Sequence, residues 1–248
     1  MRNASKSIAG YAMNSVASAR FTFILAISVL AGCSALPDKP VRPVLYDFGP
    51  GTVVAAATKR EAALPAVALE DITTVGGALD NTALLYRLTY ANEQQLRPYA
   101  AARWSTPPAQ LVRQRLREKL SETRPVFGSR DGLALNRPSG APVPGLLGAR
   151  AVPPDSVPEA LPLRLRLELE EFSHLFTAPD TSMGVIRLRA TLIDISRGGE
   201  RLVGQRSIVV QRPATTADAP GGVRALTAAT DAAIDELDQW LQTAPVPR

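Results

Sequence analysis

The sequence predicts an α+β fold, with a largely antiparallel sheet and two main helices packed on one of its faces. Segments that alternate apolar and polar residues fall into two runs, and each run is followed by a segment with helical spacing of apolar residues. A long stretch rich in proline and glycine separates the two halves. Such segregated runs of strands and helices are typical of α+β domains. Hydrophobic residues make up 46% of the 248-residue chain, enough for one core of ordinary size.

The first half is expected to contain four strands, because its alternating segments end at glycine or proline. These strands are predicted at residues 44–51, 66–72, 84–90 and 99–104. Gly49, Pro50 and Gly51 end the first of them. Tyr46, Phe48, Tyr86 and Tyr90 are interpreted as sheet residues, with a lipid groove as the alternative.

A helix is predicted after the fourth strand. Ser105 or Thr106 would cap it, Pro107 and Pro108 would occupy its first turn, and it would end before Pro125. Its apolar stripe consists of Leu111, Val112, Leu116 and Leu120. Its basic residues are Arg113, Arg115, Arg117 and Lys119. They spread around the helix and predict a solvated face, with contact to acidic lipid headgroups as the alternative.

Residues 129–161 contain six prolines and four glycines. A loop of this length without regular structure is uncommon inside a compact domain. We therefore expect disorder or a loosely packed excursion there.

The C-terminal third gives the clearest pattern. Four leucines at every second position from Leu163 to Leu169 alternate with charged residues, which predicts a half-buried strand. Strands at residues 185–195 and 202–211 are joined by a short turn containing Gly198 and Gly199, as in an antiparallel hairpin. A closing helix is expected to begin at Gly221 or Gly222 and to end before Pro245.

The N-terminus has the layout of a bacterial export signal. Basic residues precede an apolar run at residues 21–30, which is shorter than the roughly 20 residues that span a bilayer. The motif that follows is Leu30-Ala31-Gly32-Cys33. It resembles the lipobox read by lipoprotein signal peptidase, which implies cleavage of residues 1–32 and attachment of lipid to Cys33. The alternative is a plain signal peptide with a chance cysteine, but Cys33 is the only cysteine in the chain.

Residues 33–43 are predicted to form a tether between the lipid and a single domain at residues 44–243. Pro37, Pro40 and Pro43 would make it a semi-rigid spacer with a reach of about 30 Å. Ser34 follows the lipidated cysteine, where an aspartate would resemble an inner-membrane retention signal. We therefore expect an outer-membrane lipoprotein that faces the periplasm.

Composition argues against several kinds of site. One cysteine and one histidine leave no Cys-based zinc site and no His-pair metal site, so no metal is expected. Without residues 1–32 the chain has 25 basic and 23 acidic residues, a net charge of +2, which argues against nucleic-acid binding. No phosphate-binding loop of the form G-x-x-x-x-G-K-S/T occurs in the chain.

No catalytic residue is assigned. His174 is interpreted as a loop residue just past a strand, although Ser173 and Asp180 lie near it in the sequence. A catalytic triad is defined by geometry, and no G-x-S-x-G motif is present. Asp47, Glu70 and Asp71 are interpreted as solvated charges at strand edges. No cofactor is expected apart from the covalent lipid on Cys33.

The chain resembles the ABC-type transport auxiliary lipoproteins, the family that includes paraquat-inducible protein C. The resemblance covers most of the chain after Gly32. It rests on Leu30-Ala31-Gly32-Cys33, residues 45–50, Leu85-Tyr86-Arg87, Arg103-Trp104, residues 165–172, residues 192–209 and the helix that closes at Trp240-Leu241.

This resemblance implies a non-enzymatic subunit of a lipid-transport system between the inner and outer membranes. Its partner would be a protein with mammalian-cell-entry domains, and ATP would be hydrolysed by another subunit. A homo-oligomer is left open. The alternative is a lipoprotein assembly factor of another outer-membrane machine. Arg103 and Trp104 are candidate partner-binding residues, with core packing as the favoured alternative for Trp104.

Overall fold

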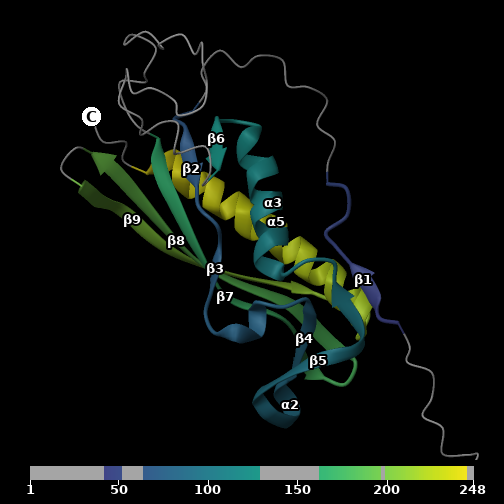
Figure 1. Cartoon of the computed structure of the whole chain (residues 1–248). Helices are drawn as coiled ribbons and strands as arrows, with labels where there is room; N and C mark the ends of the chain where they lie inside the picture. The colour runs from purple at the N-terminus through teal and green to yellow at the C-terminus, as the bar shows by residue number, and fades with distance from the viewer. Residues whose placement is uncertain (1–41, 52–63, 129–161, 197–198, 245–248) are drawn as a thin grey trace, which may run out of the picture. The chain divides into compact units, whose positions relative to one another are not determined.

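The computed structural model describes residues 42–51, 64–128, 162–196 and 199–244. The described residues from Pro43 onward belong to one compact unit with a nine-stranded sheet (Figure 1). The strands are β1 (Val44–Tyr46), β2 (Val67–Leu69), β3 (Thr73–Thr74), β4 (Ala83–Leu88), β5 (Glu93–Trp104), β6 (Val126–Gly128), β7 (Leu163–Ala178), β8 (Thr181–Ser196) and β9 (Gly199–Pro213). The helices are η2 (Gly77–Leu79), α2 (Thr89–Asn92), α3 (Pro108–Ser121) and α5 (Ala219–Thr243). The predicted α+β class is confirmed.

The sheet is organised around β7. One edge of β7 pairs antiparallel with β8, which in turn pairs antiparallel with β9. Along the other edge, three short strands pair parallel with successive parts of β7: Val67 lies opposite Leu163, Thr73 opposite Glu168 and Tyr86 opposite His174. β2, β3 and β4 thus act as one interrupted strand.

The expectation of a largely antiparallel sheet is therefore only partly right. The β4–β5, β7–β8 and β8–β9 pairs are antiparallel, but β1 runs parallel to β5 and β2 runs parallel to both β6 and β7. Parallel neighbours need long crossover connections. Here β2 and β7 are separated by the chain through β4, β5 and α3, so sequence-local hairpin signals do not reveal the pairing.

The alternation of β7 is confirmed, and the strand is longer than predicted. Leu165, Leu167 and Leu169 are fully buried. A bulge between Leu169 and Glu171 then inserts one extra residue, so the buried positions continue at Phe172 and His174. This change of phase hides the second half of the strand from a period-two reading. The placement of His174 in a loop is wrong for this reason.

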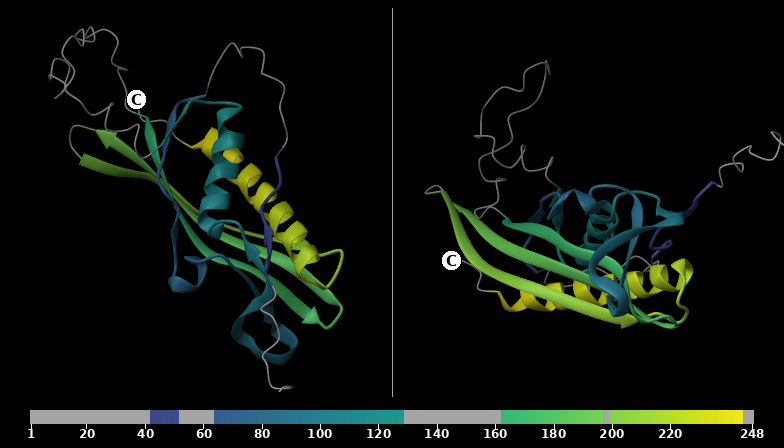
Figure 2. Two further views of the ribbon diagram at one scale, coloured as in Figure 1. Left: turned by 45° about the vertical axis from the view of Figure 1, so that its right-hand side comes forward. Right: turned by 90° about the horizontal axis from the view of Figure 1, so that it is seen from below.

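Both main helices lie on the leucine face of the sheet, as predicted. α5 packs across β8 and β9, and α3 packs beside α5 (Figures 1 and 2). Their buried residues belong to one apolar core with the β7 leucines. The fully buried residues of the two helices include Val112, Leu116, Leu120, Leu226, Ile234 and Leu237.

The helix starts differ from the predicted ones. α3 begins at Pro108 with Pro107 as its N-cap, and neither Ser105 nor Thr106 caps it through a side chain. Pro108 has no N–H group that would need an acceptor, which removes part of the need for a cap. α5 begins two residues before Gly221, because the Asp218 carboxylate accepts a hydrogen bond of 2.8 Å from the Gly221 N–H.

A buried ion pair joins the end of the α3 segment to α5. The Arg124 Nη2 atom lies 2.9 Å from Asp238 Oδ1, and their side chains are only 2% and 9% exposed. Asp238 Oδ2 accepts a second hydrogen bond from Gln242, at 3.0 Å. A buried charge is costly unless it is paired, so each partner depends on the other.

Removing one partner of this pair should destabilise the domain strongly. We expect Arg124→Met or Asp238→Leu alone to lower the free energy of unfolding by about 3–5 kcal/mol, since each leaves an uncompensated buried charge. The double variant should recover most of that loss, as urea denaturation would show. A loss in the double variant equal to the sum of the two single losses would contradict this coupling.

Gly184 on β8 allows α5 to approach the sheet. A Cβ atom at position 184 would lie 2.5 Å from the backbone carbon of Ala225. We expect Gly184→Ala to lower the free energy of unfolding by about 1–3 kcal/mol through overpacking. Gly77→Ala is the matched control, because nothing lies within 4 Å of that position. Equal thermal stability of the two variants would refute the close contact.

Candidate functional site

The predicted lipid site lies outside the described residues. Leu30, Ala31, Gly32 and Cys33 precede Arg42, the first residue that the structure describes. Lipid attachment at Cys33 therefore stays a prediction, as does the interpretation of residues 129–161.

Trp104 is a core residue. Its side chain is 1% exposed, and its ring centroid lies 5.5 Å from that of Phe172 and 5.7 Å from that of Phe48. The guanidinium of Arg103 donates to carbonyl oxygens of its own strand, those of Tyr99 and Ala102. Trp104 is therefore packed in the core and is not accessible as an anchor for a partner.

The buried polar centre of the domain is His174. Its side chain is fully buried, and Nδ1 lies 2.9 Å from the Tyr99 hydroxyl. Burial raises the pKa of Tyr99, so the phenol stays protonated and donates to Nδ1. Burial also lowers the pKa of His174 to about 4, so the imidazole is neutral at pH 7. Nε2 then carries the proton, and it has no hydrogen-bond partner among the described residues.

His174 also sets how closely α5 approaches the sheet. A Cβ atom at Gly222 would lie 2.4 Å from Nδ1, so the first turn of α5 rests directly on the imidazole ring. The ring of Phe176 completes the packing at a centroid distance of 4.4 Å. This environment is one of close packing around a neutral imidazole.

Ser173 and His174 do not form a nucleophile–base pair in this arrangement. Consecutive strand residues point to opposite faces of a sheet. The Ser173 hydroxyl donates instead to the carboxylate of Glu171, at 2.5 Å. The nearby Asp180 lies in the turn between β7 and β8. The geometry of a Ser–His–Asp triad is therefore not assembled by these three residues.

The basic residues of α3 are mostly engaged within the domain. Arg115 Nε lies 2.8 Å from Asp231 of α5, and Lys119 Nζ lies 3.5 Å from Asp235 of the same helix. Arg113 pairs with Asp71 at 3.1 Å. The expected solvated basic face is thus largely a set of ion pairs, and Arg117 is the exposed member of the group.

The outer face of the sheet carries a network of alternating charges. Glu70 accepts from both Arg164 and Arg166, at 3.0 and 2.9 Å. Arg189 on β8 donates to Glu170 at 2.7 Å. The carboxylates that the sequence singled out as Glu70 and Asp71 are therefore ion-paired, and Asp47 accepts from the Gly49 N–H.

A groove of about 890 Å³ lies between the start of α3 and residues 71–80. Its charged lining consists of Asp71, Asp80, Arg113 and Arg117. Asp71 is bound by Arg113, and Asp80 accepts from the Thr74 hydroxyl. The lining is balanced in charge, so electrostatics alone selects neither anions nor cations for this groove.

The described residues were also searched for metal sites and membrane-spanning helices. They contain no group of three or more His, Cys, Asp or Glu side chains placed to hold a metal ion. None of their helices is long and apolar enough to cross a membrane.

Among solved structures, the chain is similar to protein XCC0632 from Xanthomonas campestris, described with the family model DUF330. The TM-score is 0.56 at 15% sequence identity, over 81% of this chain and 95% of that chain. At this identity the similarity establishes a shared fold. No protein-family model matches the sequence, and no curated protein matches it.

Two other solved structures match with lower scores. Hypothetical protein CT253 from Chlamydia trachomatis has a TM-score of 0.43 and 9% identity, over 73% of this chain and 98% of that chain. Lipoprotein GNA1162 from Neisseria meningitidis has a TM-score of 0.32 and 14% identity, over 71% and 99%. These scores do not establish a common fold.

The neutral, buried His174 should make stability depend on pH. Its folded pKa of about 4 lies below the ordinary 6.5, so the unfolded chain binds the proton first as the pH falls. The stabilising contribution is present above pH 6.5 and is lost toward pH 4. We expect unfolding free energy to fall by about 2 kcal/mol more between pH 7 and pH 5 in the parent chain than in His174→Asn. Equal losses in urea denaturation would contradict this interpretation.

Proposed function

We propose that this chain is a lipid-anchored docking subunit of an ABC-type lipid transporter that connects the inner and outer membranes. The observation that carries the proposal is the position of Cys33, the only cysteine, directly after an apolar run and Leu30-Ala31-Gly32. The sequence resemblance to transport auxiliary lipoproteins supplies the transporter. The fold that this chain shares with XCC0632 shows that a similar domain occurs in a protein of Xanthomonas campestris.

The tether supports an anchoring role. Nine residues separate Cys33 from the compact unit, which begins at Pro43. Pro37 and Pro40 within this spacer, and Pro43 at its end, would keep it extended over about 30 Å. Several acyl chains anchor a protein stably because each buried CH₂ group contributes about 0.8 kcal/mol. The anchor would fix the domain near the periplasmic surface of the outer membrane, the address that Ser34 favours.

The domain itself would contribute protein contacts rather than a reaction. Its histidine is buried and neutral, Glu70 and Asp71 are ion-paired, and Asp47 caps a turn. What the described residues offer is an extended, charged sheet surface with an open edge at β9. The proposed partner is the protein with mammalian-cell-entry domains that crosses the periplasm.

Cys33→Ala should separate anchoring from folding. We expect the variant to leave the membrane fraction and to lose most transport-dependent protection of the cell envelope, with the thermal stability of the domain unchanged. Ser34→Asp is the matched control, because it keeps the lipid but should shift the protein toward the inner membrane. Full transport by soluble Cys33→Ala protein would show that tethering is not required.

A further inference from the structure

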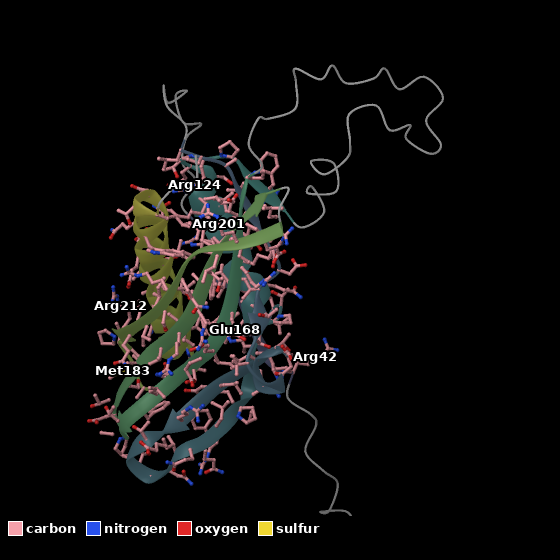
Figure 3. All side chains as sticks on the ribbon, turned by 90° about the vertical axis from the view of Figure 1, so that its left-hand side faces the viewer. Arg42, Arg124, Glu168, Met183, Arg201 and Arg212 are labelled. Atoms are coloured by element: carbon pink, nitrogen blue, oxygen red, sulfur yellow. The ribbon has the colours of Figure 1, made fainter. Side chains whose placement is uncertain are left out.

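β9 forms an open edge of the sheet. Residues 205–213 pair in continuous register with β8, and no described strand pairs with β9 on its other side. Figure 1 shows β9 at the outer edge of the sheet, and Figure 3 views the molecule from this side, with Arg201 and Arg212 toward the two ends of the strand. Every second residue of such an edge directs its backbone N–H and C=O groups outward. These groups form a template for another strand.

The usual protections of an edge strand are few here. Proteins guard open edges with charged side chains, lysine above all, and with proline, bulges or short strands. β9 has 15 residues and no lysine, and its one proline is its last residue, Pro213. A bulge at Val203 separates the first four residues from a regular run of ten, from Gly204 to Pro213. Within that run the Val209 side chain is 50% exposed.

The charge of this run is entirely positive. Residues 205–213 contain Arg206 and Arg212 and no acidic residue. Arg187 on β8 lies directly beside Val209 in the register, and it is exposed. Arg206 pairs with Glu236 of α5, at 2.8 Å, whereas Arg187 and Arg212 form no ion pair within the described residues. Arg187 and the exposed Val209 thus lie on the outer face of the sheet, whereas Arg212 lies on the opposite face, with Ile208 and Val210, so this edge has one unpaired guanidinium group on each face.

An aromatic side chain borders the same strand at its bulged end. The Trp240 ring lies against Gly204, where a Cβ atom would be 3.3 Å from the indole Cζ2. Trp240 is half-buried and belongs to the last turns of α5. Tryptophan and arginine are the residues most enriched at binding hot spots.

We propose that β9 binds an extended acidic segment of a partner protein, which adds a strand to the sheet. Backbone hydrogen bonds would supply affinity, and carboxylates facing Arg212 and Arg187 would select the partner. A second copy of this chain fits less well, because pairing β9 with itself would bring two positive strands together. The proposal deepens the docking function by naming the chemistry of the partner segment. It concerns the domain alone and does not depend on the lipid at Cys33.

The test uses the mature chain carrying Cys33→Ala and a synthetic nine-residue peptide of valine and threonine with pairs of consecutive glutamates, which would present carboxylates on both faces of the added strand. A matched peptide has lysine in place of each glutamate. We expect the acidic peptide to bind, to slow amide hydrogen exchange at residues 205–212, and to bind more weakly at high salt. The lysine peptide should produce neither effect.

Arg212→Glu should weaken binding of the acidic peptide about fivefold, the value of one exposed ion pair. Arg117→Glu, which changes the same charge on α3, is the control and should leave binding unchanged. Equal binding of both peptides, or protection outside β9, would overturn the proposal. So would concentration-dependent protection of β9 without peptide, since that result would identify a second copy as the occupant. Membrane release of Cys33→Ala is a separate readout, so failure here leaves the anchoring role untouched.

Discussion

The domain depends on the burial of one face of β7. Leu165, Leu167 and Leu169 are fully buried beneath the two helices, and both edges of the strand are paired. A slip of one residue would turn these leucines to the charged outer face, so the register of the whole sheet is strongly specified. The positions of β2, β3 and β4 follow from this register, because each pairs with a different part of β7.

The two helices are held on that face by more than apolar packing. Arg115, Lys119 and Arg124 each pair with an acidic residue of α5. These three carboxylates lie at positions 231, 235 and 238, which share one side of the helix. These ion pairs from α3 and from Arg124 just after it therefore help to hold α5 in place, and α5 in turn covers β8 and β9. Their structural use explains why a basic helix need not indicate an anionic ligand.

Much of this fold could be predicted from the spacing of apolar residues along the sequence alone. The leucine alternation after Leu163 and the apolar stripe of α3 identified two of its central elements correctly. β3 has only two residues and β2 only three, which is too short for a periodic signal. The bulge at Glu170 reversed the alternation and hid the strand around His174. The Arg124–Asp238 pair could not be predicted either, since its partners are 114 residues apart and neither lies in a recognisable motif.

Some functional residues can also be recognised from the sequence, whereas others require the structure. The address of the protein rests on a local motif around Cys33, which a sequence displays directly. A docking surface such as β9 requires a strand with one unpaired edge. Which strand has such an edge is known only once the order of strands in the sheet is known. Trp104 shows the converse, because an aromatic side chain that resembles a surface anchor in sequence packs against Phe48 and Phe172 in the core.

The most direct test of the docking role is cross-linked affinity purification of the lipidated protein from membranes, with its partners identified by mass spectrometry. We predict recovery of a protein with mammalian-cell-entry domains. Recovery of a different outer-membrane machine without that protein would contradict the transporter account and favour an assembly factor.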